Sequence, residues 1–118
     1  MAKILIVDDS TELLDLFSLL LSSQGDHVRT ATNIKKAQEQ LQWIKFDVVL
    51  LDVRLGNEDG RQLSYIISME YNIPVILISG DAELLRNYTT FGAMAVLEKP
   101  FDLDVVHKTI EDVLNRKK

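Results

Sequence analysis

The 118-residue sequence contains no cysteine, and this absence excludes several classes of site. Disulfide bonds, zinc sites built from thiolates and catalysis by a thiol nucleophile all need cysteine side chains. The sequence also lacks an apolar run of 18 residues and a signal-peptide pattern. We therefore expect no segment that spans or crosses a membrane, and we expect the protein to be cytoplasmic.

Positive charge is scarce as well. The chain has 13 Lys and Arg residues against 18 Asp and Glu, which gives a net charge of −5. An acidic surface repels phosphate backbones, so we expect no direct contact with nucleic acid. The short basic tail Arg116-Lys117-Lys118 is interpreted as the solvated end of a helix.

The remaining composition, 47% apolar and 26% charged, is that of an ordinary globular protein, and the length fits a single domain over residues 1–118. Short apolar runs alternate with segments of helical periodicity, with no repeat or linker between them. This alternation is typical of βαβ units around a parallel sheet. The predicted strands are Lys3–Val7, His27–Ala31, Val48–Leu51, Val75–Ile78 and Ala95–Leu97.

The segments between these strands carry apolar residues at helical spacing. The predicted helices cover about Thr11–Gln24, from Thr32 or Asn33 to Ile44, Gly60–Tyr71, Ala82–Phe91 and Leu103–Arg116. Trp43 is expected to be a partial core anchor, and Met69 to face the core. Because crossovers are right-handed, these units predict an α/β fold of the flavodoxin-like, doubly wound (βα)5 type, with a five-stranded parallel sheet in the order 2-1-3-4-5.

The first predicted strand ends in two adjacent carboxylates, Asp8 and Asp9. Two charges about 5 Å apart repel each other by roughly 3 kcal/mol at an effective dielectric constant near 20, so a positive partner is expected. In the order 2-1-3-4-5, the strand order reverses between strands one and three, where ligands of open α/β sheets bind. Asp52 ends strand three at this point. The three carboxylates predict a site for a hard divalent cation, most simply Mg²⁺.

Ser79 and Lys99 end strands four and five at the same edge of the predicted sheet. Taken singly, an Asp after a strand commonly caps a helix, a Ser begins a loop and a Lys is solvated. All of them together at the last positions of strands indicate a functional site. His27 and His107 are isolated in the sequence and are interpreted as solvated.

The sequence resembles the receiver domain of two-component response regulators. The resemblance covers nearly the whole chain, and the motifs that carry it are ILIVDDS, LLDVRLGNEDG, VILISG and EKPFD. It implies that Asp52 is the phosphoacceptor, which takes a phosphoryl group from the histidine of a kinase or of a histidine phosphotransfer protein. The chain would assist its own phosphorylation and dephosphorylation without being a turnover enzyme.

The resemblance also implies roles for the other residues of the site. Asp9 and Asp52, together with the backbone carbonyl of Arg54, would bind Mg²⁺ directly, while Asp8 would act mostly through a water molecule. Ser79 would donate a hydrogen bond to a phosphoryl oxygen.

Lys99 would pair with the charge of the phosphoryl group, and the bond between Lys99 and Pro100 would be cis. Phosphorylation would switch the face formed by the fourth helix, the fifth strand and the fifth helix. An output target, which the sequence does not identify, and a phosphorylation-dependent homodimer are the partners expected besides the kinase.

Some positions depart from the family pattern. Gly56 replaces the usual proline four residues after the acceptor, which favours a looser loop. Val96 replaces the usual aromatic residue or histidine three positions before the lysine, so the output switch is expected to be weaker or differently routed. Arg54 and Asp81 are expected at the mouth of the site, either paired across it or pointing to solvent.

Two other functions use similar residues. A small Mg²⁺-dependent phosphatase with an aspartate nucleophile, such as a haloacid-dehalogenase-like enzyme, shares the Asp, Ser and Lys chemistry. Its DxD motif follows the first strand, however, whereas this chain has adjacent Asp8-Asp9 and a lone Asp52 on strand three. A pseudo-receiver that serves only as an interaction module would not need the intact set of site residues.

Overall fold

The five apolar runs form one parallel sheet in the computed structural model, which describes residues 1–117. Lys118, the last residue of the predicted domain and of the basic tail, lies outside the described residues. The sheet order is β2-β1-β3-β6-β7, which is the predicted 2-1-3-4-5 order of a flavodoxin-like fold. Its strands are β1 (Lys3–Val7), β2 (His27–Ala31), β3 (Val48–Asp52), β6 (Val75–Ser79) and β7 (Ala95–Glu98).

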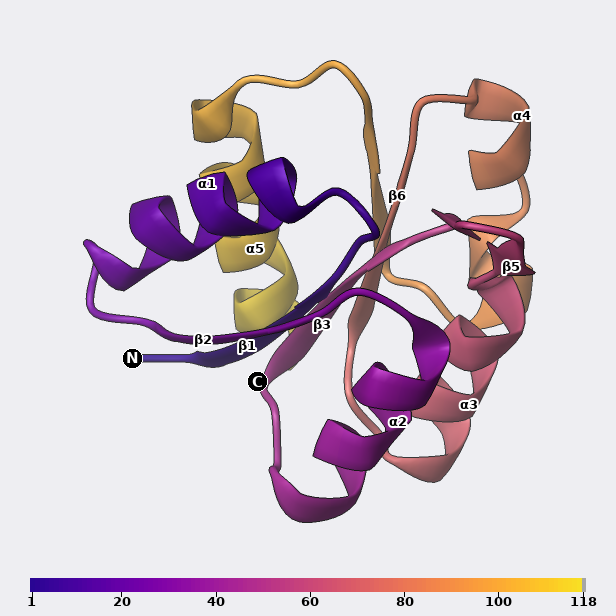
Figure 1. Cartoon of the computed structure of the whole chain (residues 1–118), viewed down its shortest axis with the longest axis horizontal. Coiled ribbons are helices and arrows are strands. Elements are labelled where there is room, and N and C mark those ends of the chain that lie inside the picture. Colours follow the sequence, from indigo (N-terminus) through magenta and orange to yellow (C-terminus); the bar gives the residue numbers. More distant parts are fainter. Residues whose placement is uncertain (118) are drawn as a thin grey trace.

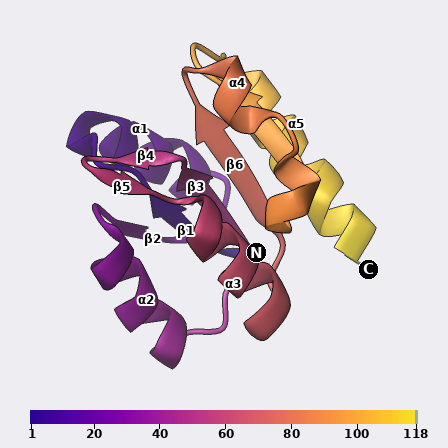
Figure 2. The same ribbon diagram turned by 90° about the vertical axis from the view of Figure 1, so that its right-hand side faces the viewer.

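The helices cover both faces of this sheet. Helices α1 and α5 lie on one side, and α2, α3 and α4 lie on the other (Figures 1 and 2). Asn33 caps α2 by accepting a hydrogen bond from the Lys36 N–H, as its type predicts. The helices are α1 (Thr11–Ser22), α2 (Ile34–Trp43), α3 (Arg61–Glu70), α4 (Ala82–Leu85) and α5 (Leu103–Lys117).

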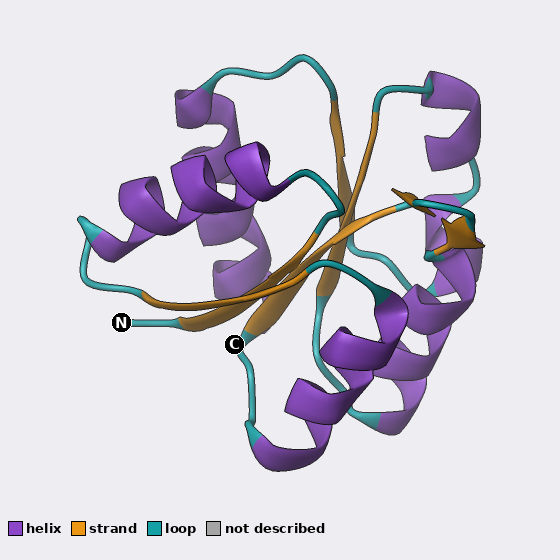
Figure 3. Ribbon diagram, viewed as in Figure 1, coloured by secondary structure: helices purple, strands orange, loops and turns teal. Residues whose placement is uncertain are grey.

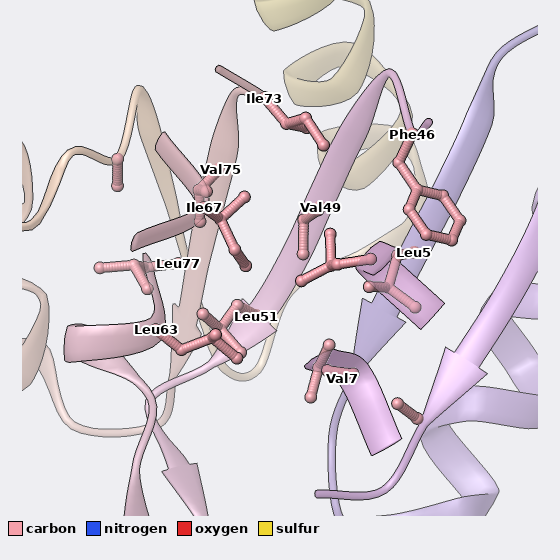
Figure 4. Close-up of a cluster of buried hydrophobic side chains, with 14 of the residues drawn as sticks. Leu5, Val7, Phe46, Val49, Leu51, Leu63, Ile67, Ile73, Val75 and Leu77 are labelled. Carbon is pink, nitrogen blue, oxygen red and sulfur yellow. The ribbon is translucent and has the colours of Figure 1, made fainter. Parts of the chain in front are cut away.

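Each face of the sheet has its own hydrophobic core, because successive strand side chains point to opposite faces. Leu5 and Val7 of β1 belong to the cluster beneath α2 and α3, which also contains Phe46 (Figure 4). Ile4 and Ile6 belong to the cluster beneath α1 and α5, which contains Phe17. Every residue of β3 and β6 is buried, as expected for strands covered on both sides.

The loop that follows β3 is more ordered than the sequence predicts. It forms a small antiparallel hairpin of β4 (Arg54–Leu55) and β5 (Glu58–Asp59). Gly56 at its turn has a φ of +63°, a left-handed conformation that glycine adopts without strain. The hairpin holds this loop in a defined position beside the carboxyl edge of the sheet.

The predicted fourth helix is divided into two pieces. Helix α4 covers only Ala82–Leu85, and a 3-10 turn, η1, covers Tyr88–Phe91. Asn87 between them has a φ of +58°, which no α-helical residue adopts and which Asn tolerates better than most residues. The covering of β6 on this side is therefore assembled from two short pieces.

Two side-chain expectations need correction. Trp43 is 86% exposed and Met69 is 63% exposed, so neither belongs to the core. Each lies two positions after an inward-facing residue of its helix, Leu41 or Ile67, and two positions rotate a helical side chain by about 200°. The His107 side chain is 40% exposed, in keeping with the expectation of a solvated residue, and its Nε2 lies 2.9 Å from Oε1 of Glu111.

Phe17 of α1 and Phe101, which precedes α5, stack with their ring centroids 5.7 Å apart. This contact links the loop after β7 to the core beneath α1.

Near the end of the chain, the Arg116 guanidinium donates to the Met94 carbonyl oxygen at 3.2 Å. Within residues 1–117, none of the helices has the length and apolar character needed to cross a membrane.

Candidate functional site

Three carboxylates meet where β1 and β3 end, as the strand order predicts. Each of Asp8, Asp9 and Asp52 offers an oxygen within 4.8 Å of the others. Asp8 is fully buried and Asp52 is 4% exposed, whereas Asp9 is exposed. Asp52 is the last residue of β3, whereas Asp8 and Asp9 begin the loop that follows β1. The loops at the strand ends are teal in Figure 3. The arrangement concentrates negative charge where water can reach only part of it.

Short backbone turns fix two of the carboxylates. Oδ1 of Asp8 accepts the Ser10 N–H at 2.9 Å, and Oδ1 of Asp52 accepts the Arg54 N–H at 3.0 Å. Ser10 in turn caps α1 by accepting the Leu13 N–H. The turn that begins α1 thus also orients Asp8.

Lys99 supplies the positive charge that the carboxylates need. Its Nζ lies 2.9 Å from Oδ2 of Asp52 and 3.2 Å from Oδ2 of Asp8. Its backbone N–H donates to the Ser79 carbonyl at 2.8 Å, which anchors the strand end. The Lys99-Pro100 peptide bond is cis, as predicted.

The electrostatics of the site follow from burial and crowding. Burial raises the pKa of Asp8 to about 6, and the nearby Asp52 charge adds to the effect, against the Ser10 N–H and Lys99, which lower it. Burial by itself would lower the pKa of Lys99, but its bonds to Asp52 and Asp8 outweigh burial and raise that pKa. Lys99 is therefore a permanent cation facing two buried acids.

Ser79 is 2% exposed, and its Oγ accepts the Asp81 N–H at 3.0 Å. At the mouth of the site, the Arg54 guanidinium lies 3.4 Å from Oδ2 of Asp81. These two side chains are 70% and 44% exposed, so the predicted pair exists but is solvated. The groups enclose a cavity of about 480 Å³ lined by Asp9, Asp52, Arg54, Gly56, Ser79, Gly80, Asp81 and Lys99.

Every predicted site residue therefore lies at one edge of the sheet. The sequence reasoning missed one contributor, the Gly56 N–H, which donates to Oδ2 of Asp9 at 2.9 Å. The signal was present in the Gly56-Asn57 pair, a dipeptide typical of hairpin turns.

A family model described as the response regulator receiver domain matches residues 4–111. The chain belongs to this family. Receiver domains bind Mg²⁺ at an acidic pocket, and the aspartate cluster of this receiver could hold such an ion. A receiver is a signalling domain of two-component systems rather than a turnover enzyme.

Relatives and solved structures agree with this assignment. The receiver is 33% identical over 118 residues to the transcriptional regulatory protein GlrR of Escherichia coli K12, covering 98% of this chain and 27% of GlrR. It is 32% identical over 117 residues to BasR of the same strain, covering 97% of this chain and 53% of BasR. The receiver thus spans between a quarter and about half of these longer relatives.

Two solved structures show the same architecture. The chemotaxis response regulator CheY4 of Vibrio cholerae is 29% identical, with a TM-score of 0.87 and coverage of 96% of this chain and 98% of that one. The beryllofluoride-activated NtrC4 receiver domain dimer is 27% identical, with a TM-score of 0.91 and full coverage of both chains.

Proposed function

We propose that this receiver, over residues 1–118, accepts one phosphoryl group on Asp52 in an Mg²⁺-dependent reaction. The donor is the phosphorylated histidine of a kinase or of a histidine phosphotransfer protein, and the exchange takes place in the cytoplasm. The observation that carries the proposal is the position of Asp52: its carboxylate is almost buried, touches Lys99 at 2.9 Å and lines the open cavity.

The reaction asks for a nucleophile and for cancellation of charge. A carboxylate oxygen of Asp52 attacks phosphorus, the bond from phosphorus to the donor histidine breaks, and the imidazole keeps the electron pair. Phosphoryl transfer depends mainly on alignment and electrostatic stabilisation. Lys99 already lies at the acceptor and would follow a phosphoryl oxygen, while the Ser79 hydroxyl would donate to another.

The donor set fits Mg²⁺, which prefers carboxylate and carbonyl oxygens. Asp9, Asp52 and the Arg54 carbonyl would hold the ion directly, and Asp8 would act through a water molecule. When bound, Mg²⁺ would neutralise charge that develops on the phosphoryl oxygens. The oxygens of Asp8, Asp9 and Asp52 within 4.8 Å of one another support this assignment.

Phosphorylation adds charge and strong acceptors, and the response of Ser79 and Lys99 would switch the face made of α4, β7 and α5. That face would bind the output target. A phosphorylation-dependent homodimer is part of the proposal, supported by the activated NtrC4 receiver, which was solved as a dimer.

Labelling with acetyl phosphate tests the function. Wild-type protein with Mg²⁺ is expected to gain the mass of one phosphoryl group, whereas Asp52→Asn gains none. Asp112→Asn, on the exposed side of α5, serves as the control and is labelled like wild type. Equal labelling of the Asp52 variant, or labelling that persists in EDTA, contradicts the proposal.

A generic phosphomonoester separates the receiver from the phosphatase alternative. Steady release of phosphate over many turnovers would identify a hydrolase. Stoichiometric labelling by acetyl phosphate without such turnover is expected here.

A further inference from the structure

The Asp9 carboxylate accepts a hydrogen bond from a distant part of the chain. Asp8 and Asp52 are each oriented by an N–H only two residues ahead, at Ser10 and Arg54. The bond from the Gly56 N–H to Oδ2 of Asp9 instead joins residues 47 positions apart. It connects the loop after β1 to the β4–β5 hairpin.

The hairpin turn explains why this N–H is available. Leu55 pairs with Glu58, so Gly56 and Asn57 occupy the two central positions of the turn. Gly56 has a φ of +63° and Asn57 has a negative φ, the signs typical of a type II′ turn with glycine first. An added Cβ at Gly56 would meet nothing within 4 Å, so backbone conformation and not crowding favours glycine.

We propose that the Gly56 N–H is a positioning group for the metal ligand Asp9. The bond holds Oδ2 toward the hairpin. Oδ1 would then be the oxygen that binds Mg²⁺, since a carboxylate has two oxygens and ample lone pairs. Groups that orient a metal ligand raise metal affinity by reducing the ordering that binding requires. This inference rests on the Mg²⁺ site of the proposed function.

The same geometry couples the hairpin to the metal. Strand β4 begins at Arg54, whose carbonyl is a proposed ligand, and ends beside Gly56, which contacts the ligand Asp9. Mg²⁺ would therefore hold both ends of β4, one directly and one through Asp9. We call the hairpin closed when the Gly56 N–H is bonded to Asp9. Linkage is reciprocal, so the factor by which this closed state strengthens Mg²⁺ binding equals the factor by which bound Mg²⁺ stabilises the closed state.

Two variants made by peptide ligation isolate the N–H. Gly56→D-Ala and Gly56→D-Pro both favour the positive φ that the turn needs, but only D-Pro lacks the donor. Leu55 already lies in a strand, which suits the residue before a proline. Intact folding of both is checked from the amide resonances of β1 and β3.

Mg²⁺ is titrated into each protein, and its Kd is obtained from the amide shifts of Asp8 and Ser10. Wild type and Gly56→D-Ala are expected to bind equally, and Gly56→D-Pro roughly tenfold more weakly, the lower end of the range for groups that orient a ligand because Asp9 is exposed. Equal Kd values for the two variants overturn the positioning role of the Gly56 N–H but leave the proposed Mg²⁺ site intact. A wild type that shows no saturable response overturns the metal site of the proposed function as well.

Hydrogen exchange of wild type tests the coupling without any substitution. Saturating Mg²⁺ is expected to slow exchange of the Gly56 amide by about the same factor, roughly tenfold. The amide of Lys36, bonded to Asn33 in the cap of α2, is the internal control and is expected to be unchanged. Gly56 exchange that does not respond to bound Mg²⁺ contradicts the inference.

Discussion

Asp8, Asp52 and Ser79 form a buried floor of the site, whereas Arg54 and Asp81 form an exposed rim. On the floor, no residue of this set is more than 4% exposed. On the rim, the two charged side chains are 70% and 44% exposed and their contact is 3.4 Å long. The floor carboxylates face the Lys99 cation, and Arg54 faces Asp81 on the rim, yet the two regions differ in how well water screens their charges.

This difference separates the chemistry of the site from its modulation. Charges that water cannot reach interact strongly and leave a large penalty when a partner is removed. Exposed pairs contribute about 0–1 kcal/mol and can be lost with little effect. We therefore expect substitutions on the floor to change the free energy of unfolding and the extent of phosphorylation. Substitutions on the rim should change only the rate at which the phosphorylated protein is hydrolysed.

The largest effect is expected from Lys99→Met. The substitution leaves Asp52 and Asp8 buried without their cation, and breaking a buried pair costs about 3–4 kcal/mol. Urea unfolding at pH 7 in EDTA, followed by circular dichroism, measures this loss. Lys108→Met, on the exposed surface of α5, is the control and should change stability little. A similar loss in both variants would show that the floor is as screened as the surface.

A somewhat smaller effect is expected from Asp8→Asn as a function of pH. The folded pKa of about 6 lies above the ordinary 3.8, so the contribution of Asp8 to stability is complete below pH 3.8 and is lost as pH rises through 6. In EDTA, the stability of wild type relative to Asp8→Asn should fall by about 2–3 kcal/mol between pH 4 and pH 7. A stability difference that stays constant over this range would contradict the electrostatic description of the floor.

At the rim, the pair of Arg54 and Asp81 should affect how long the phosphate lasts. In the phosphorylated protein, water would have to reach phosphorus through this mouth, and we expect the paired side chains to obstruct it. Arg54→Ala and Asp81→Asn should each speed hydrolysis of the phosphorylated protein by less than about fivefold, the rate equivalent of 1 kcal/mol.

The double variant decides whether the two side chains act together. Pairing requires that it hydrolyses no faster than either single variant. Asn is used at position 81 because Oδ1 of Asp81 also caps α4 by accepting the Glu83 N–H. Hydrolysis rates that stay unchanged in all variants would contradict the idea that the pair obstructs water. So would single-variant rate increases that multiply in the double variant.

The smallest effect concerns Val96, a half-buried residue of β7 away from both regions. Valine has one stiff χ1 and little reach, so it could not fill the space that Ser79 would leave on moving toward a phosphoryl group. Beryllofluoride should therefore shift the amides of β7 less in wild type than in Val96→Tyr, with Val96→Ile resembling wild type. Large shifts centred on Val96 in the wild type would refute this expectation.

The sheet and the floor were predictable because their signals are local and strong. Continuous apolar runs marked β3 and β6, and the strand order alone brought Asp8 and Asp52 together. The left-handed residues were harder to predict. Asn87 divides the predicted fourth helix, and Gly56 turns the predicted loop into a hairpin, because a single positive φ redirects the chain without altering the pattern of apolar residues.

Trp43 was mispredicted for a different reason. Its size suggested a core residue, yet the inner face of the ten-residue α2 is already supplied by Ala37 and Leu41. Position on the helix therefore outweighed hydrophobicity, and one exposed apolar side chain is common on a protein surface.

The stacked rings of Phe17 and Phe101 make one side of the site more rigid than the other. Phe101 follows Lys99 by two residues, and its partner ring is fully buried, so packing against the core holds the segment after Lys99 in place. Across the cavity, Ser79 leads into a helix of only four residues. A phosphoryl group in the cavity should displace the less firmly held side. We therefore expect the segment from Ser79 to α4 to move, while the Lys99 backbone stays in place.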